Sequence, residues 1–150
     1  MQDAGIYARE YDLLSCAVQL GVAGGQVINV SFPDTVPTDA EGDHPLLDRI
    51  DDYLGGEEDH FDDVPVALTV STEQRRVLDA LRKLPYGETV SVDRVARLAG
   101  FDDEDGEEME TVRSALRANP IPLFVPDHRV EGAQGATPSH VAKRLRTVER

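Results

Sequence analysis

The chain has 150 residues, 40% of them hydrophobic, which suits one ordinary domain or two small ones with a modest core. It carries 29 acidic against 15 basic side chains, a formal net charge of −14, and such an excess is typical of proteins adapted to high internal salt. A single cysteine excludes a disulfide framework and a thiolate metal cluster, and we expect neither a metal nor a cofactor. The sequence has no long apolar run and no signal-peptide pattern, so we expect a cytoplasmic protein with no membrane partner.

The first half of the sequence predicts a small antiparallel sheet followed by one helix. Two apolar runs, Cys16–Val22 and Gln26–Phe32, flank a glycine turn at Gly24-Gly25, and Gly5–Arg9 supplies a third strand. After a loop over residues 33–43, Pro45 begins a helix that Gly55-Gly56 ends, with its apolar residues at helical spacing: Leu46, Leu47, Ile50, Tyr53 and Leu54. We place a domain boundary near residues 64–70, between an acidic sheet-plus-helix domain (1–66) and a second domain (67–150).

The second half begins with a pair of capped helices. Ser71 and Gln74 form the pattern of a capping box for a helix that ends before Pro85. Ser91 caps a second helix that stops at Gly100, with these residues expected to face inward: Val92, Val95, Ala96, Leu98 and Ala99. A third helix is expected from about Glu107 to Ala118. The second and third helices resemble a helix-turn-helix with an unusually long connection.

Two elements are expected after the third helix. Ile121–Val125 predicts a short extended segment. Thr137-Pro138 begins a last helix, whose inward residues are Val141, Ala142, Leu145 and Val148.

The basic residues are concentrated in the second half of the chain. Residues 1–66 carry two basic and 15 acidic side chains, whereas residues 67–150 carry 13 basic and 14 acidic ones. Seven of those 14 acids lie within residues 102–110. The rest of the second half is therefore positively charged, which is enough for a basic face.

Four segments of the second half share one order and spacing with a known family signature: Leu84–Ser91, Ala96–Gly100, Ala115–Pro122 and Pro126–Val130. Residues 71–130 closely resemble the O6-alkylguanine-DNA alkyltransferase family, and the first 66 residues resemble it through the order of elements. The resemblance implies an α/β (α+β) fold, with a small antiparallel sheet domain joined to a winged-helix-like helix-turn-helix domain. Members of this family flip an alkylated guanine out of the duplex and transfer the alkyl group irreversibly to a cysteine.

The acceptor position departs from the family pattern. In the family motif Pro-Cys-His-Arg-Val the cysteine accepts the alkyl group, and here Asp127 occupies its place. A carboxylate is a much weaker nucleophile than a thiolate in such a displacement, so we expect normal transfer to be lost. The resemblance places His128 at the histidine that activates the thiol and Glu149 at the carboxylate that orients it. In the alternative interpretation, His128 and Arg129 only hold this turn together.

Two residues that handle the flipped base are also missing. The family tyrosine that polarises the base corresponds to Val92, which donates no hydrogen bond. The family arginine that fills the gap in the duplex corresponds to Glu110, which phosphates repel. A shift of register by three residues would place Arg113 there instead.

The base pocket is expected below Pro126, where Asp127 lies close to His128 and Glu149 and where Tyr86 and Val92 line the wall. The glycine-rich lid of the family is shortened to Gly132–His140 and lacks its usual tyrosine. We therefore expect the mouth of the pocket to be wider than in the family.

The resemblance favours an alkyltransferase-like protein, from a branch that lacks the acceptor cysteine and marks alkylated DNA for another repair pathway. Its expected partners are double-stranded DNA with alkylated guanine and a repair protein, and we expect a monomer. The residues expected to face DNA are Arg113, Ser114, Arg117 and Asn119, with phosphate contacts from Arg94, Arg97 and Arg129.

Two alternatives stay open at this point. In the first, the protein is an active methylated-DNA methyltransferase in which Asp127 accepts the alkyl group as an ester that water later removes. In the second, a degenerate family member serves as a protein-interaction module.

Overall fold

The structure is a computed structural model, and it describes residues 4–150. The first half contains β1 (Gly5–Tyr11), the 3-10 turn η1 (Asp12–Leu14), β2 (Cys16–Ala23), β3 (Gln26–Ser31) and α1 (Pro45–Leu54). The second half contains α2 (Thr72–Leu81), β4 (Val90–Ser91), α3 (Val92–Leu98), α4 (Gly106–Arg117), η2 (Asp127–Arg129), β5 (Val130–Glu131) and α5 (Ser139–Val148). None of the helices within residues 4–150 is long and apolar enough to cross a membrane.

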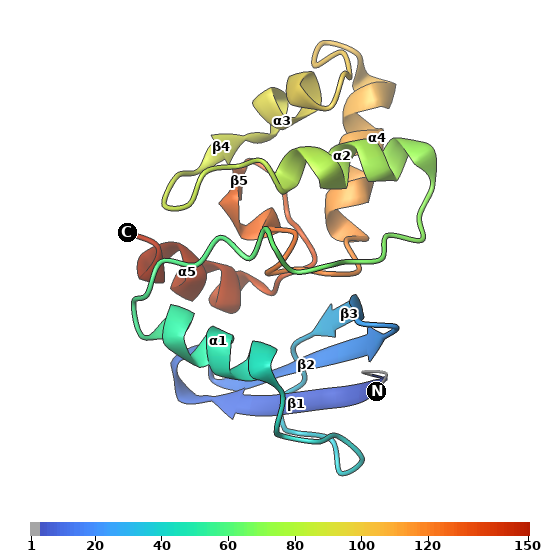
Figure 1. The fold of residues 1–150 in the computed structure, drawn as a ribbon. Coiled ribbons are helices and arrows are strands. Elements are labelled where there is room, and N and C mark those ends of the chain that lie inside the picture. Colours follow the sequence, from blue (N-terminus) through green and yellow to red (C-terminus); the bar gives the residue numbers. More distant parts are fainter. Residues whose placement is uncertain (1–3) are drawn as a thin grey trace.

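The first half forms a three-stranded antiparallel sheet in the order β1-β2-β3, with α1 packed beside it (Figure 1). Gly24 and Gly25 have φ angles of 59° and 77°, which L side chains rarely adopt, and they let Ala23 pair with Gln26 across the turn. The predicted hairpin and the predicted helix over residues 45–54 are confirmed. Buried residues of this half pack against the second half in one hydrophobic core.

The second half is helical, and its helices begin at the expected capping residues. The Ser71 Oγ accepts from the Gln74 N–H at 3.2 Å, and the Ser91 Oγ accepts from the Arg94 N–H at 3.2 Å. The Gln74 side chain donates to the Ala118 carbonyl at 3.2 Å, so it ties α2 to the end of α4 and does not complete a capping box. The mixed fold with a small antiparallel sheet and a helical C-terminal part is the predicted one.

Two local predictions are wrong. Residues 121–125 form a tight turn and not an extended segment, because the Val125 N–H donates to the Ile121 carbonyl at 2.9 Å and Leu123 has a φ of 78°. Leu98 was expected to face inward, but it is 56% exposed. The helix α3 is short, and its inner face consists of residues such as Val95 and Ala96, which are fully buried. Leu98 lies outside this face.

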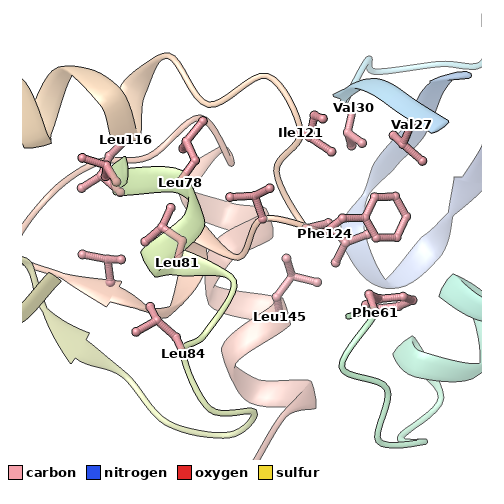
Figure 2. Close-up of a cluster of buried hydrophobic side chains, with 14 of the residues drawn as sticks. Val27, Val30, Phe61, Leu78, Leu81, Leu84, Leu116, Ile121, Phe124 and Leu145 are labelled. Atoms are coloured by element: carbon pink, nitrogen blue, oxygen red, sulfur yellow. The ribbon is translucent and has the colours of Figure 1, made fainter. Parts of the chain in front are cut away.

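A continuous apolar core joins the two halves (Figure 2). The rings of Phe61 and Phe124 meet at 5.1 Å between centroids, and the Val30 N–H donates to the Pro120 carbonyl at 2.9 Å. The helix α5 lies between α1 and the α2–α4 group (Figure 1). The domain boundary near residues 64–70 stays a prediction, and this stretch is itself hydrogen bonded to β3, where the Ala67 N–H donates to the Val27 carbonyl.

Candidate functional site

Ten consecutive residues, 121–130, run through the interior, and all of them are buried. The segment ends at β5, which pairs in parallel with β4 through Val90 and Val130. It carries three polar side chains inside the protein, Asp127, His128 and Arg129, which are 3%, 2% and 4% exposed. Buried polar groups require hydrogen-bond partners, so the neighbours of these three side chains define the site.

Glu149, the residue after α5, is the common partner of His128 and Arg129. Its Oε2 lies 2.8 Å from His128 Nε2, and Arg129 donates to its two oxygens at 2.9 Å each. The Tyr53 hydroxyl on α1 donates to the same Oε2 at 2.5 Å. Burial alone would raise the pKa of Glu149, but the hydrogen bonds from His128 and Arg129 hold it well below its usual range. The structure therefore brings the predicted pair of His128 and Glu149 together as part of a buried charged network.

The glycine at position 87 allows this network to close. Gly87 has a φ of 83°, and a Cβ placed on it would lie 2.9 Å from the Glu149 carbonyl oxygen. Its N–H donates to Glu149 Oε1 at 3.3 Å. The Tyr86-Gly87 turn thus fixes the end of α5 against the interior segment.

Asp127 shares no hydrogen bond with His128 or Glu149, and its carboxylate binds the loop of residues 132–137, here named the lid loop. Its Oδ1 accepts from the Thr137 hydroxyl at 2.6 Å, and its Oδ2 accepts from the N–H groups of Ala136 at 2.8 Å and Thr137 at 3.4 Å. The Asn119 side-chain amide adds a fourth hydrogen bond at 3.1 Å. Burial raises the pKa of Asp127, while the hydrogen bonds from Thr137 and Asn119 act in the opposite direction.

A glycine lets the lid loop approach the carboxylate this closely. A Cβ on Gly135 would lie 2.5 Å from Asp127 Cγ, a distance that side-chain carbons do not tolerate. The other end of the lid loop is held by Arg113 on α4, whose guanidinium donates to the Gly132 carbonyl at 2.7 Å. The lid loop is therefore fastened at both ends, and Asp127 is the latch at its C-terminal end.

The Nδ1 atom of His128 is buried and has no hydrogen-bond partner among the described residues. The other ring nitrogen is occupied by Glu149. Glu149 thus orients the imidazole through Nε2, and Nδ1 is not hydrogen bonded to the Asp127 carboxylate.

A cavity of about 590 Å³ opens beside Asp127. It is lined by Asp127 and His128, by β5 and the lid loop, and by one face of α5. Tyr86, Val92 and Pro126, which we expected in the pocket, are not part of this lining. Tyr86 stacks on His60 at 5.6 Å between ring centroids, and buried Val92 faces Gly132 of the lid loop.

The predicted DNA-facing residues fall into an exposed group, one half-buried residue and a buried pair. Ser114 and Arg117 are exposed on α4, and both hydrogen bond Glu110 Oε2, at 3.1 and 2.8 Å. These contacts with Arg117 and Ser114 lower the pKa of Glu110. Arg113, on the same helix, is half-buried beside the lid loop. On α3, Arg94 is exposed and Arg97 pairs with Asp103 at 2.5 Å.

The buried pair has internal roles that the sequence did not reveal. Asn119 is 4% exposed, and its amide binds Asp127, the Val125 carbonyl and the Ile121 N–H. Arg129 is enclosed by Glu149 and the Leu84 carbonyl, so its guanidinium presents no exposed face to a phosphate. The roles of Thr137 and Gly135 at the latch were also missed, because Thr137 was interpreted only as the start of the last helix.

Comparison with known proteins matches residues 72–149 to the family model described as 6-O-methylguanine DNA methyltransferase, DNA binding domain. A methylated-DNA--protein-cysteine methyltransferase of Methanopyrus kandleri is 33% identical over 112 residues, which cover 73% of this chain and 81% of that protein. A DNA base-flipping protein of Thermus thermophilus is 35% identical over 108 residues, 69% of each chain. The crystal structure of Mycobacterium tuberculosis OGT in complex with DNA has a TM-score of 0.67 and 28% identity, and the match covers 83% of this chain and 77% of that one.

Proposed function

The chain belongs to the 6-O-methylguanine DNA methyltransferase family, and from this premise we propose that it is an alkyltransferase-like protein, which binds alkylated guanine in duplex DNA without transferring the alkyl group to itself. Residues 72–149 form the DNA-binding domain of that family. The proposal is carried by one observation. The acceptor position holds a buried carboxylate whose two oxygens are bound by donors from Asn119, Ala136 and Thr137.

A carboxylate in this state is a poor nucleophile for two reasons. Attack on an alkyl carbon requires a lone pair directed at that carbon, and the lone pairs of Asp127 are directed at protein donors instead. Burial also raises its pKa, which disfavours the anion that would have to attack. Both effects support loss of transfer, and both also argue against an ester intermediate on Asp127.

Binding of DNA is supported by the family domain and by the M. tuberculosis structure, which is a complex with DNA. Base flipping is what the name of the T. thermophilus relative states, and we propose the same step for this chain. The exposed side chains of α3 and α4, Arg94, Ser114 and Arg117, are the candidate contacts for the DNA backbone. We propose further that the protein acts as a cytoplasmic monomer and that a separate repair protein completes the repair.

The proposal is tested by measuring the affinity of the chain for duplexes with and without O6-methylguanine over a series of potassium chloride concentrations. We expect tighter binding of the modified duplex. Equal affinity for both duplexes would contradict lesion recognition.

Transfer is tested separately with a duplex that carries a labelled methyl group. We expect no label on the protein. If the parent chain became labelled and the Asp127→Asn variant did not, the ester-forming alternative would be established. Asp127→Asn is the matched variant because the amide has nearly the same shape and can keep an oxygen toward Ala136.

A further inference from the structure

The helix α5 differs in charge from the rest of this acidic chain. It carries Lys143, Arg144 and Arg146 and no acidic residue, whereas every other α-helix within residues 4–150 contains at least one aspartate or glutamate. The chain as a whole has 29 acidic and 15 basic residues. A helix with only basic charges attracts a polyanion even when the net charge of the protein is negative.

Three of the side chains on α5 line the cavity beside the lid loop: His140, Lys143 and Arg146. They recur every third residue, so they share one side of the helix and form a row about 9 Å long. Arg144 lies outside this lining. The row of cationic groups therefore faces the cavity, and Arg144 provides a natural comparison on the same helix.

The cavity has further features that suit an anion. Pro138 caps α5 without a side-chain hydrogen bond, so the first N–H groups of the helix, at Ser139 and His140 on the cavity wall, have no side-chain acceptor. Lys143 forms no ion pair or side-chain hydrogen bond within residues 4–150, and Arg146 uses one N–H group on the His128 carbonyl at 3.1 Å.

Two carboxylates also line the cavity, and they limit where an anion can sit. The oxygens of Asp127 are turned to the lid loop and Asn119, which supply four donors to it. Glu131 is exposed and lies on β5, not on α5. The α5 side of the cavity is thus the side that favours negative charge.

We propose that the cavity between the lid loop and α5 binds a phosphate group of the DNA backbone, with Lys143 and Arg146 as the main contacts. The DNA-contact surface then extends from α4 across the lid loop to α5. The hydrogen bond from Arg113 to the Gly132 carbonyl joins α4 to the lid loop, and the lid loop also lines the cavity. This inference rests on the proposed function, because it requires that the chain bind DNA.

The test compares Lys143→Ala with Arg144→Ala, two variants that remove one exposed positive charge from the same helix. Duplex affinity is measured over a series of potassium chloride concentrations. Loss of one phosphate contact lowers the slope of log K against log salt by about 0.9, which corresponds to about eightfold weaker binding in about 0.1 M salt. We expect this change for Lys143→Ala and an unchanged slope for Arg144→Ala.

Equal effects of the two variants, or no effect of either, would overturn the phosphate site and leave the proposed function intact. Failure of the parent chain to bind any duplex would overturn both.

A second arm uses deoxyguanosine monophosphate as competitor. If the mononucleotide binds in a Lys143-dependent way while duplex affinity is indifferent to Lys143, the cavity takes a free nucleotide and the assignment to the DNA backbone is wrong. Thermal unfolding of both variants should match the parent, since both side chains are exposed.

Discussion

At the scale of single residues, a carboxylate at position 127 has hydrogen-bonding capacity that a thiol lacks, and this chain uses it to hold the lid loop. Asp127 accepts four hydrogen bonds, three of them from the lid loop residues Ala136 and Thr137. Gly135 makes the approach sterically possible. The side chain at position 127 is therefore coupled to the surrounding loop, and a substitution there changes the contacts of the loop as well as the reactive group.

We predict that Asp127→Cys will not restore efficient repair of O6-methylguanine. The substitution supplies a thiol, but in the correspondence with the family that we propose, Val92 has no donor for the base and Glu110 takes the place of an arginine. Loss of a donor aimed at the reacting group costs on the order of 100-fold in rate, and base flipping still costs a few kcal/mol. The measurement is transfer of labelled methyl from a duplex at high salt. Complete transfer within minutes would show that neither Val92 nor Glu110 impairs the reaction.

Glu149 offers a prediction about stability and its dependence on pH. Glu149→Gln leaves Arg129 without its buried counter-charge, which we expect to lower the free energy of unfolding by about 3–5 kcal/mol at neutral pH. The folded pKa of Glu149 lies below that of the unfolded chain, about 4.3. Its contribution is therefore fully present above that pH and is lost as the pH falls through the folded pKa.

Denaturant unfolding at several pH values measures this contribution. The difference between the parent and Glu149→Gln should shrink only below a pH of about 4. Glu131→Gln is the matched control, because Glu131 is exposed on β5 and should behave as the parent does. A Glu149→Gln variant as stable as the parent at neutral pH would mean that the buried network contributes nothing to folding.

At the scale of elements, the lid loop and α4 are each held by hydrogen bonds within the protein. The lid loop is bound to Asp127 at one end and to Arg113 at the other. On α4, the exposed Arg117 and Ser114 are occupied by Glu110 of the same helix. In the free protein, the polar groups of both elements are therefore occupied by hydrogen bonds within the same chain.

We predict that Asp127→Ala will loosen the lid loop and that Asp127→Asn will not. Alanine leaves the donors of Ala136, Thr137 and Asn119 without an acceptor, and each buried donor left alone costs about 1–3 kcal/mol. Asparagine can keep its oxygen toward Ala136 and donate to the Thr137 hydroxyl. Hydrogen exchange of the Ala136 amide reports the difference. Equal exchange rates in the parent and both variants would show that Asp127 is not the latch.

We predict that Glu110→Gln will strengthen DNA binding, because it frees Arg117 and Ser114 and removes a charge that phosphates repel. The slope of log K against log salt should become steeper. Glu107→Gln, on the first turn of the same helix, makes the same change in net charge. If both variants raise the affinity equally, the effect is one of net charge and the pairing with Arg117 is irrelevant.

At the scale of the whole molecule, the fold could be predicted wherever local signals decide it. The Gly24-Gly25 turn, the caps at Ser71 and Ser91 and the proline at the start of α1 each act within a few residues, and all of them are found in the structure. The turn at residues 121–125 and the parallel pair of β4 and β5 depend on partners distant in sequence or on the Asn119 side chain, so periodicity could not predict them.

The site could be predicted only through the resemblance to the family. The partnership of His128 with Glu149 spans 21 residues, and the bond from Tyr53 to Glu149 spans 96. No spacing rule reaches across such separations. The burial of Asn119 and Arg129 follows from the path of residues 121–130 through the core, which the sequence did not indicate.

The negative charge of the molecule is concentrated in its first half, residues 1–66, which carry 15 acidic and two basic side chains. Between residues 4 and 66 every acidic side chain except that of Asp59, which is half-buried, lies at the surface. We propose that this acidic surface is an adaptation to high salt, in which carboxylates hold water at the surface while screening weakens their mutual repulsion. In the same proposal, the basic side chains of α5, which are Lys143, Arg144 and Arg146, provide a local positive surface for DNA.

The measurement that tests the central claim most directly is the mass of the protein recovered from its complex with a duplex that contains O6-methylguanine. We predict that the complex forms in preference to one with the unmodified duplex and that the recovered protein has an unchanged mass. Protein that has gained a methyl group would contradict the claim that this chain recognises the lesion without accepting its alkyl group.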